Sequence, residues 1–148
     1  MSAVLKNEFL YVPLLVWVCI QCFKFIVDWI INGKPNYKRL CGAGGMPSSH
    51  SAVVATLTTL IGKKYGLDSG VFAISCVFSA VVMYDAAGVR RAAGKQATLL
   101  NKLIENSANS GIVVSEKLVE VLGHTPFQVL VGALLGISVG LLYGFFNM

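Results

Sequence analysis

The sequence predicts an all-α integral membrane bundle of about four transmembrane helices plus one amphipathic interfacial helix. First, 55% of the 148 residues are hydrophobic and only 13% are charged, a balance too apolar for an ordinary soluble domain. Second, the apolar residues stand in blocks long enough to cross a bilayer. Third, the polar motifs lie between these blocks. The length fits a single membrane domain covering residues 1–148.

The first two expected helices differ in length. Residues 9–31 would extend about 34 Å, enough to cross a hydrocarbon core of about 30 Å. A second helix is expected from Pro47, after a glycine-rich loop, to about Gly62. Because it would reach only about 24 Å, we expect its start to lie below the membrane surface.

Two further spans are expected at residues 70–87 and 127–146. Between them, residues 96–106 place leucine and isoleucine at helical spacing, with charged residues on the other side. This pattern predicts the amphipathic interfacial helix.

Four alternating spans would bring three polar clusters to one side of the membrane, at residues 44–51, 84–97 and 123–128. The loops on that side, 32–47 and 88–126, carry eight of the twelve basic residues. Basic loops favour the cytoplasmic side, so we expect the site loops to be cytoplasmic and both termini to lie on the opposite side.

The first cluster is a glycine-rich turn that leads into a helix start. Its Ser48 and Ser49 and the free amides of the first helical turn suit a phosphate, although serine also caps ordinary helices. His50, just inside that helix, could donate a proton to a leaving oxygen.

The second cluster contains Arg90 and Arg91, which could grip phosphate oxygens with two hydrogen bonds each. Asp85 is expected to hold an arginine. A purely topological role for these cations, as an anchor at the membrane surface, is the alternative. Lys24, inside the first apolar block, could snorkel to the surface or reach the phosphate.

The third cluster places His124 at the start of the last helix, with Gln128 one turn further on. A neutral imidazole could attack phosphorus if Gln128 accepted a hydrogen bond from its other nitrogen. A helix-capping or interfacial role for His124 is the alternative.

A glycine face is expected on the last helix, where glycine recurs at every fourth position: Gly132, Gly136, Gly140 and Gly144. Such a face permits close helix packing, either inside the chain or in a homo-oligomer, and the sequence favours neither.

Other partners are not expected. The net charge of +5 is explained by membrane orientation and phosphate, with no basic aromatic stripe for nucleic acid. Asp85 is a lone carboxylate in its cluster and the cysteines lack a paired metal-binding pattern, so no metal and no cofactor are predicted.

The three clusters resemble motifs of the type 2 phosphatidic acid phosphatase superfamily, and more closely its divergent branch, described as acid phosphatase/vanadium-dependent haloperoxidase-related. GGMPSSHSA at 44–52 is similar to the PSGH motif. HTPFQVLVGALLG at 124–136 is similar to the histidine motif that ends the superfamily's pattern, and MYDAAGVRRAAGKQA at 83–97 resembles the divergent branch itself.

The resemblance implies that His124 is the nucleophile and that His50 protonates the leaving group. Gln128 stands where the superfamily has the carboxylate that orients the nucleophile, and Leu118 stands where it has an arginine. The cations that could replace the missing phosphate ligands come from other positions: Arg39, Arg90, Arg91, Lys38 and Lys95.

The sequence therefore predicts an integral membrane phosphatase that hydrolyses a lipid phosphate monoester or prenyl diphosphate through a phosphohistidine. The alternatives are a non-catalytic phospholipid-binding protein, suggested by Gln128 and Leu118, and a small lipid-phosphate carrier assembled through the glycine face.

Overall fold

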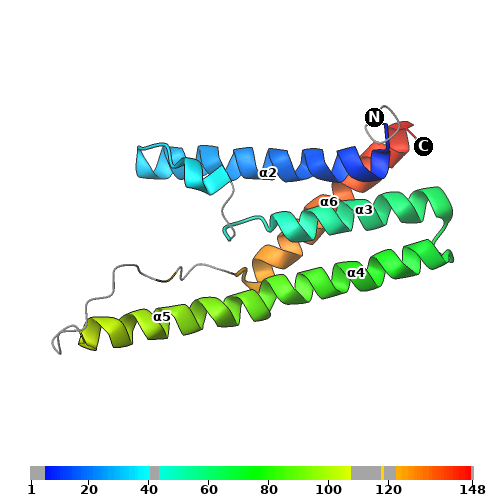
Figure 1. Ribbon diagram of the computed structural model, residues 1–148. Coiled ribbons are helices and arrows are strands. Elements are labelled where there is room, and N and C mark those ends of the chain that lie inside the picture. Colours follow the sequence, from blue (N-terminus) through cyan, green and yellow to red (C-terminus); the bar gives the residue numbers. More distant parts are fainter. Residues whose placement is uncertain (1–5, 41–43, 108–117, 119–122, 148) are drawn as a thin grey trace.

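The computed structural model describes residues 6–40, 44–107, 118 and 123–147. Over these residues the chain is all-α (Figure 1). The helices are α2 (Glu8–Asn32), the short 3₁₀ helix η1 (Tyr37–Leu40), α3 (Ser49–Tyr65), α4 (Gly70–Ala87), α5 (Val89–Ser107) and α6 (Pro126–Asn147).

Polar side chains fix the starts of three of these helices. Asn7, Ser48 and Ser69 each accept a hydrogen bond from a backbone N–H in the first turn of α2, α3 and α4 respectively. Such caps satisfy amides that have no partner inside the helix. The observed bounds of α2, α3 and α6 agree with the predicted helices to within three residues, and α4 agrees at both ends.

The short helix α3 is the centre of the bundle, packed against α2, α4 and α6. Among the described residues, three segments are long and apolar enough to cross a membrane: α2, the combined α4–α5 segment and α6. The sequence predicted about four spans. With 17 residues and two lysines in its last turn, α3 falls short of the others, as its expected length of about 24 Å had suggested.

The glycine face of α6 lies against α3 within the same chain. A Cβ added at Gly132 would lie 2.4 Å from the Ser48 carbonyl oxygen, and one at Gly136 would lie 2.2 Å from that of Ala52. The Thr56 hydroxyl also donates a hydrogen bond to the Gly136 carbonyl at 3.1 Å.

All four glycines are buried in this contact: Gly132, Gly136, Gly140 and Gly144. The face is therefore occupied by α3 of the same chain, which is the first of the two alternatives. A homo-oligomer, and a carrier assembled from it, stay predictions.

The amphipathic helix is present but differs from the prediction. It begins at Val89 instead of Gln96, and it continues roughly along the direction of α4 (Figure 1). The hydrogen bonds run on through the junction, since the Gly88 N–H donates to Tyr84 and the Gly88 carbonyl accepts from Ala92. With α4 upright in a bilayer, α5 projects past its end instead of lying flat.

The helices α2, α3, α4 and α6 alternate in direction and give the bundle two distinct ends. The described residues nearest the two termini lie together at one end (Figure 1), where Glu8 pairs with Lys64 at 3.2 Å and Phe9 stacks on Tyr65. The starts of α3 and α6 and the end of α4 lie at the other end. The polar clusters converge there.

Candidate functional site

Backbone hydrogen bonds connect the three polar clusters. The His124 N–H donates to the Ala86 carbonyl at 2.9 Å, which joins the start of α6 to the end of α4. The Ser48 N–H donates to the Gln128 carbonyl at 3.1 Å, which joins the start of α3 to the first turn of α6. Residues 38 and 80 positions apart in sequence therefore meet at one end of the bundle, as helix alternation predicted.

The two histidines face each other at this junction. Their ring centroids are 6.0 Å apart and the rings are inclined by 64°. His124 is only 2% exposed. Its Nε2 and the Nδ1 of His50 are buried, and neither has a hydrogen-bond partner in the part of the chain that the structure describes. Buried polar atoms are normally satisfied, so the pair is suited to receiving a polar ligand.

Gln128 orients His124 from within the first turn of α6. Its Oε1 lies 3.4 Å from His124 Nδ1 and accepts a hydrogen bond from the Thr125 N–H at 3.0 Å. If Nδ1 carries the proton, Gln128 holds that proton and the lone pair of Nε2 is free. The arrangement is the one expected of a nucleophilic histidine, with an amide in place of a carboxylate.

The charge state of His124 follows from its surroundings. Burial lowers the pKa of the imidazole below its ordinary value of 6.5, and the positive charge of Lys24 acts in the same direction, while the hydrogen bond with Gln128 opposes them. The neutral ring, which is the nucleophilic form, is therefore favoured.

The turn before α3 supplies a compact wall to the site. Gly44 and Gly45 have φ of 94° and 78°, in the left-handed region that glycine adopts without strain. Ser48 and Ser49 are buried. The Ser48 Oγ accepts hydrogen bonds from the Ser51 N–H and hydroxyl, so it is engaged as the cap of α3.

Lys24 reaches this turn from the middle of α2. It is only 5% exposed, and its Nζ donates to the Gly44 carbonyl at 3.1 Å. Of the two roles considered for Lys24, snorkelling to the surface is wrong, because the ammonium is buried at the glycine turn. Gly44 lies beside Lys24 about 12 Å before α2 ends, so the site is recessed within the bundle.

Gln21 is a residue that the sequence analysis missed. It lies one turn before Lys24 on the buried face of α2, is 5% exposed, and its Oε1 lacks a hydrogen-bond partner among the described residues. The available signal was its spacing of three residues from Lys24 inside an apolar helix, which places both on one face.

Asp85 and Arg90 form an ion pair at the junction of α4 and α5. Arg90 Nε lies 2.6 Å from Asp85 Oδ2, and both side chains are partly exposed. Burial lowers the pKa of His50 below its ordinary value of 6.5; the positive charges of Arg90 and Lys24 act in the same direction, and the Asp85 carboxylate opposes them. The ion pair therefore lies near His50. Asp85 thus makes the contact with an arginine that was expected of it.

Arg91 follows with an exposed side chain, and its backbone is packed against Gly123. A Cβ at Gly123 would lie 2.4 Å from the Arg91 nitrogen. This close approach joins the start of α5 to the segment before His124.

The cations predicted as further phosphate ligands are Lys95, Lys38 and Arg39. Lys95 is exposed on α5, one turn past Arg91. The side chains of Lys38 and Arg39, in and around η1, lie outside what the structure describes. Leu118 is tied to Asn101 of α5 by two hydrogen bonds of 2.9 and 3.0 Å, and thus lies about 15 Å along that helix from Arg91.

Metal ligands are not clustered in the described part of the chain, where histidine, cysteine, aspartate and glutamate side chains form no group of three or more suited to an ion. The polar atoms at the site are instead imidazole, amide, ammonium and guanidinium groups.

The fold and this cluster define a class: an all-α membrane protein whose short central helix carries in its first turn a histidine that faces a second histidine. The chain belongs to the Divergent PAP2 family, which it matches over residues 5–139. It is also 41% identical over 139 residues to the uncharacterized membrane protein YuiD of Bacillus subtilis (strain 168), covering 86% of this chain and 88% of that relative. No solved structure matches the chain.

Proposed function

We propose that this membrane protein is a phosphatase that hydrolyses a lipid phosphate monoester or a prenyl diphosphate through a phosphohistidine. The observation that carries the proposal is the facing pair of histidines. Their rings are 6.0 Å apart, Gln128 holds one nitrogen of His124, and the other nitrogen has no partner among the described residues.

The proposed reaction has two steps. In the first, the Nε2 lone pair of neutral His124 attacks phosphorus, the bond from phosphorus to the lipid oxygen breaks, and protonated His50 gives its proton to that oxygen. In the second, water attacks the phosphohistidine and passes a proton to His50, which releases inorganic phosphate and restores both histidines.

Charge stabilisation would come mainly from α2, α3 and the α4–α5 junction. Phosphoryl transfer depends mostly on positioning and on neutralising the equatorial oxygens. The buried ammonium of Lys24 acts on both histidines and the Arg90 guanidinium acts on His50. The first-turn amides of α3 present the positive end of its dipole. Arg91 and Lys95 are the next cations along α5.

Purified protein in detergent should release phosphate from phosphatidate or a polyprenyl phosphate. His124→Ala should abolish release from every ester, because each needs the nucleophile. His50→Ala should reduce hydrolysis of an alkyl phosphate far more than that of nitrophenyl phosphate, because a nitrophenolate leaves without protonation. Lys102→Ala, at an exposed position of α5, is the control. Equal residual activity of both histidine variants on both substrates would contradict these roles.

One observation favours a second candidate, a non-catalytic protein that binds lipid phosphate. The contact from Gln128 to His124 is long, at 3.4 Å, and an amide stabilises a charged imidazole less than a carboxylate does. Gln128→Glu would introduce the carboxylate with little change of shape. Turnover that appears only in this variant would identify the natural protein as the binder, whereas turnover in the unaltered protein would exclude that candidate.

A further inference from the structure

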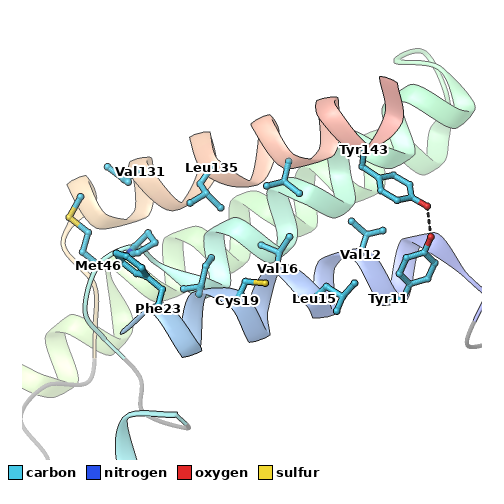
Figure 2. A pocket seen from close by; sticks show the side chains of 13 residues that line it. Tyr11, Val12, Leu15, Val16, Cys19, Phe23, Met46, Val131, Leu135 and Tyr143 are labelled. Carbon is cyan, nitrogen blue, oxygen red and sulfur yellow. Dashed lines mark hydrogen bonds between the residues drawn. The ribbon is translucent and has the colours of Figure 1, made fainter. Parts of the chain in front are cut away.

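A long apolar groove runs between α2 and α6, with a volume of about 860 Å³. Figure 2 shows it as a channel between the two helices, with Met46 and Phe23 at one end and Tyr11 and Tyr143 at the other. The side chains between these ends are aliphatic or sulfur-containing, among them Val16, Cys19 and Leu135.

One end of the groove lies at the turn that leads into α3. Met46 and Pro47 line the groove and lead directly into Ser48, Ser49 and His50 at the start of α3. The same turn accepts the hydrogen bond from Lys24. A ligand with a charged head at the histidines would therefore meet apolar surface immediately beyond the glycine turn.

The other end is closed by a polar contact. The hydroxyl groups of Tyr11 and Tyr143 form a hydrogen bond across the gap between α2 and α6 (Figure 2). Between Val131 and Tyr143 the groove follows α6 for about 18 Å. Half of a hydrocarbon core is about 15 Å thick, so the groove matches the length of one lipid chain.

We propose that this groove holds a single hydrocarbon chain of the lipid phosphate whose head group lies at His50 and His124. The inference rests on the proposed function for the position of the head group. The groove then selects substrates by their chain: a short alkyl phosphate occupies only the part near Met46, and a long one extends toward the tyrosine pair.

The first test fills the groove far from the histidines. Val139 lines the distal part and packs beside the core residues Val16 and Ile20. Val139→Trp should lower the ratio of kcat/KM for hexadecyl phosphate to kcat/KM for hexyl phosphate by about tenfold. Loss of the contacts of only about two buried methylene groups would produce a change of this size. Leu142→Trp is the matched control, because Leu142 lies on the same helix, is exposed and does not line the groove. An unchanged ratio in well-folded Val139→Trp would overturn the proposal.

The second test does not depend on turnover or on a variant. Hexadecylphosphonate, whose carbon–phosphorus bond resists hydrolysis, would carry a photoreactive group at the chain end and be cross-linked to the natural protein. We expect saturable labelling near Tyr11 and Tyr143 that excess unlabelled hexadecyl phosphate removes. Labelling spread over the exposed surfaces of α4 and α6 would mean contact with bulk lipid only and would overturn the proposal.

The two tests separate this inference from the proposed function. Groove labelling without phosphate release from any ester would leave the chain site standing and refute the phosphatase. Phosphate release with labelling elsewhere, and with no change of chain preference in Val139→Trp, would refute the groove alone.

Discussion

The tightest helix contact in the bundle lies at Gly136, and replacing this glycine with alanine gives the sharpest test of the fold. The new Cβ would lie 2.2 Å from the Ala52 carbonyl oxygen and 2.9 Å from the Cα of the same residue, whereas ordinary contacts begin at 3.4 Å. Both obstructing atoms are backbone atoms of α3 and cannot rotate away. To restore an ordinary contact of 3.4 Å in place of 2.2 Å, the two helices must separate locally by up to 1.2 Å.

The cost can be estimated from its parts. Overpacking of this kind typically costs about 1–3 kcal/mol, and loss of the hydrogen bond from Thr56 to the Gly136 carbonyl adds about 0.6 kcal/mol. Alanine favours a helix over glycine by about 1 kcal/mol, which offsets part of this. We expect Gly136→Ala to reduce the free energy of unfolding by about 0.6–2.6 kcal/mol.

Gly144→Ala is the matched control on the same face of α6. Its Cβ would meet only side-chain atoms of Lys63, the nearest at 2.6 Å, and that flexible chain can move aside. The control should be neutral or more stable by up to about 1 kcal/mol. Denaturation in detergent, followed by circular dichroism, would measure both variants.

Activity should follow stability in this comparison. His124 lies two residues before α6, so moving α6 off α3 also moves it relative to His50. Any phosphate release should therefore fall in Gly136→Ala and persist in Gly144→Ala. Equal unfolding midpoints for the two variants would refute the close backbone contact on which the reasoning depends.

Three further predictions concern charge and orientation. Because the pKa of His124 is lowered, the neutral nucleophile persists as the pH falls to 6.5. In the pH profile of kcat/KM, the acid limb that His124 contributes should therefore lie below pH 6.5, and an acid limb above that value would contradict the burial argument. Arg90→Lys should weaken inhibition by vanadate despite the retained charge, because an ammonium cannot make the two-pronged contact, and unaltered inhibition would remove Arg90 from the phosphate site. A cysteine replacing Lys102 should resist an impermeant thiol reagent in sealed cells, and rapid labelling would overturn the cytoplasmic orientation.

The convergence of the site could be predicted because it depends only on the number and order of the apolar blocks. Alternating helices bring the starts of α3 and α6 and the end of α4 to one end of the bundle, wherever the side chains point. The sequence could therefore place His50 and His124 at the same end. The 6.0 Å separation of their rings depends on packing, which periodicity does not describe.

The sequence could not predict features for which two different packing partners fit the same sequence pattern. A face of small residues suits a second helix of the same chain as well as a second copy, and only the tertiary contact of α6 with α3 shows which one is used. The sequence position of Lys24 is likewise compatible with an exposed or a buried ammonium. The structure shows that its acceptor is the Gly44 carbonyl, in a turn 20 residues away in sequence. Helix α5 continues roughly along α4 because the Gly88 N–H and carbonyl keep helical hydrogen bonds to Tyr84 and Ala92. The sequence around Gly88 did not predict these hydrogen bonds.

Under the proposed function, we expect Gln128 to decide between catalysis and binding, because the rest of the site suits either. Burial and Lys24 both favour neutral His124, which helps the attack on phosphorus, but the phosphohistidine step creates positive charge on the ring in the same surroundings. A carboxylate would compensate that charge, while the Gln128 amide offers only a dipole at 3.4 Å. Much of the compensation must then come from the dianionic phosphoryl group itself. We therefore expect turnover to be fastest for esters whose phosphate is doubly ionised, and a binder to show the same preference in affinity.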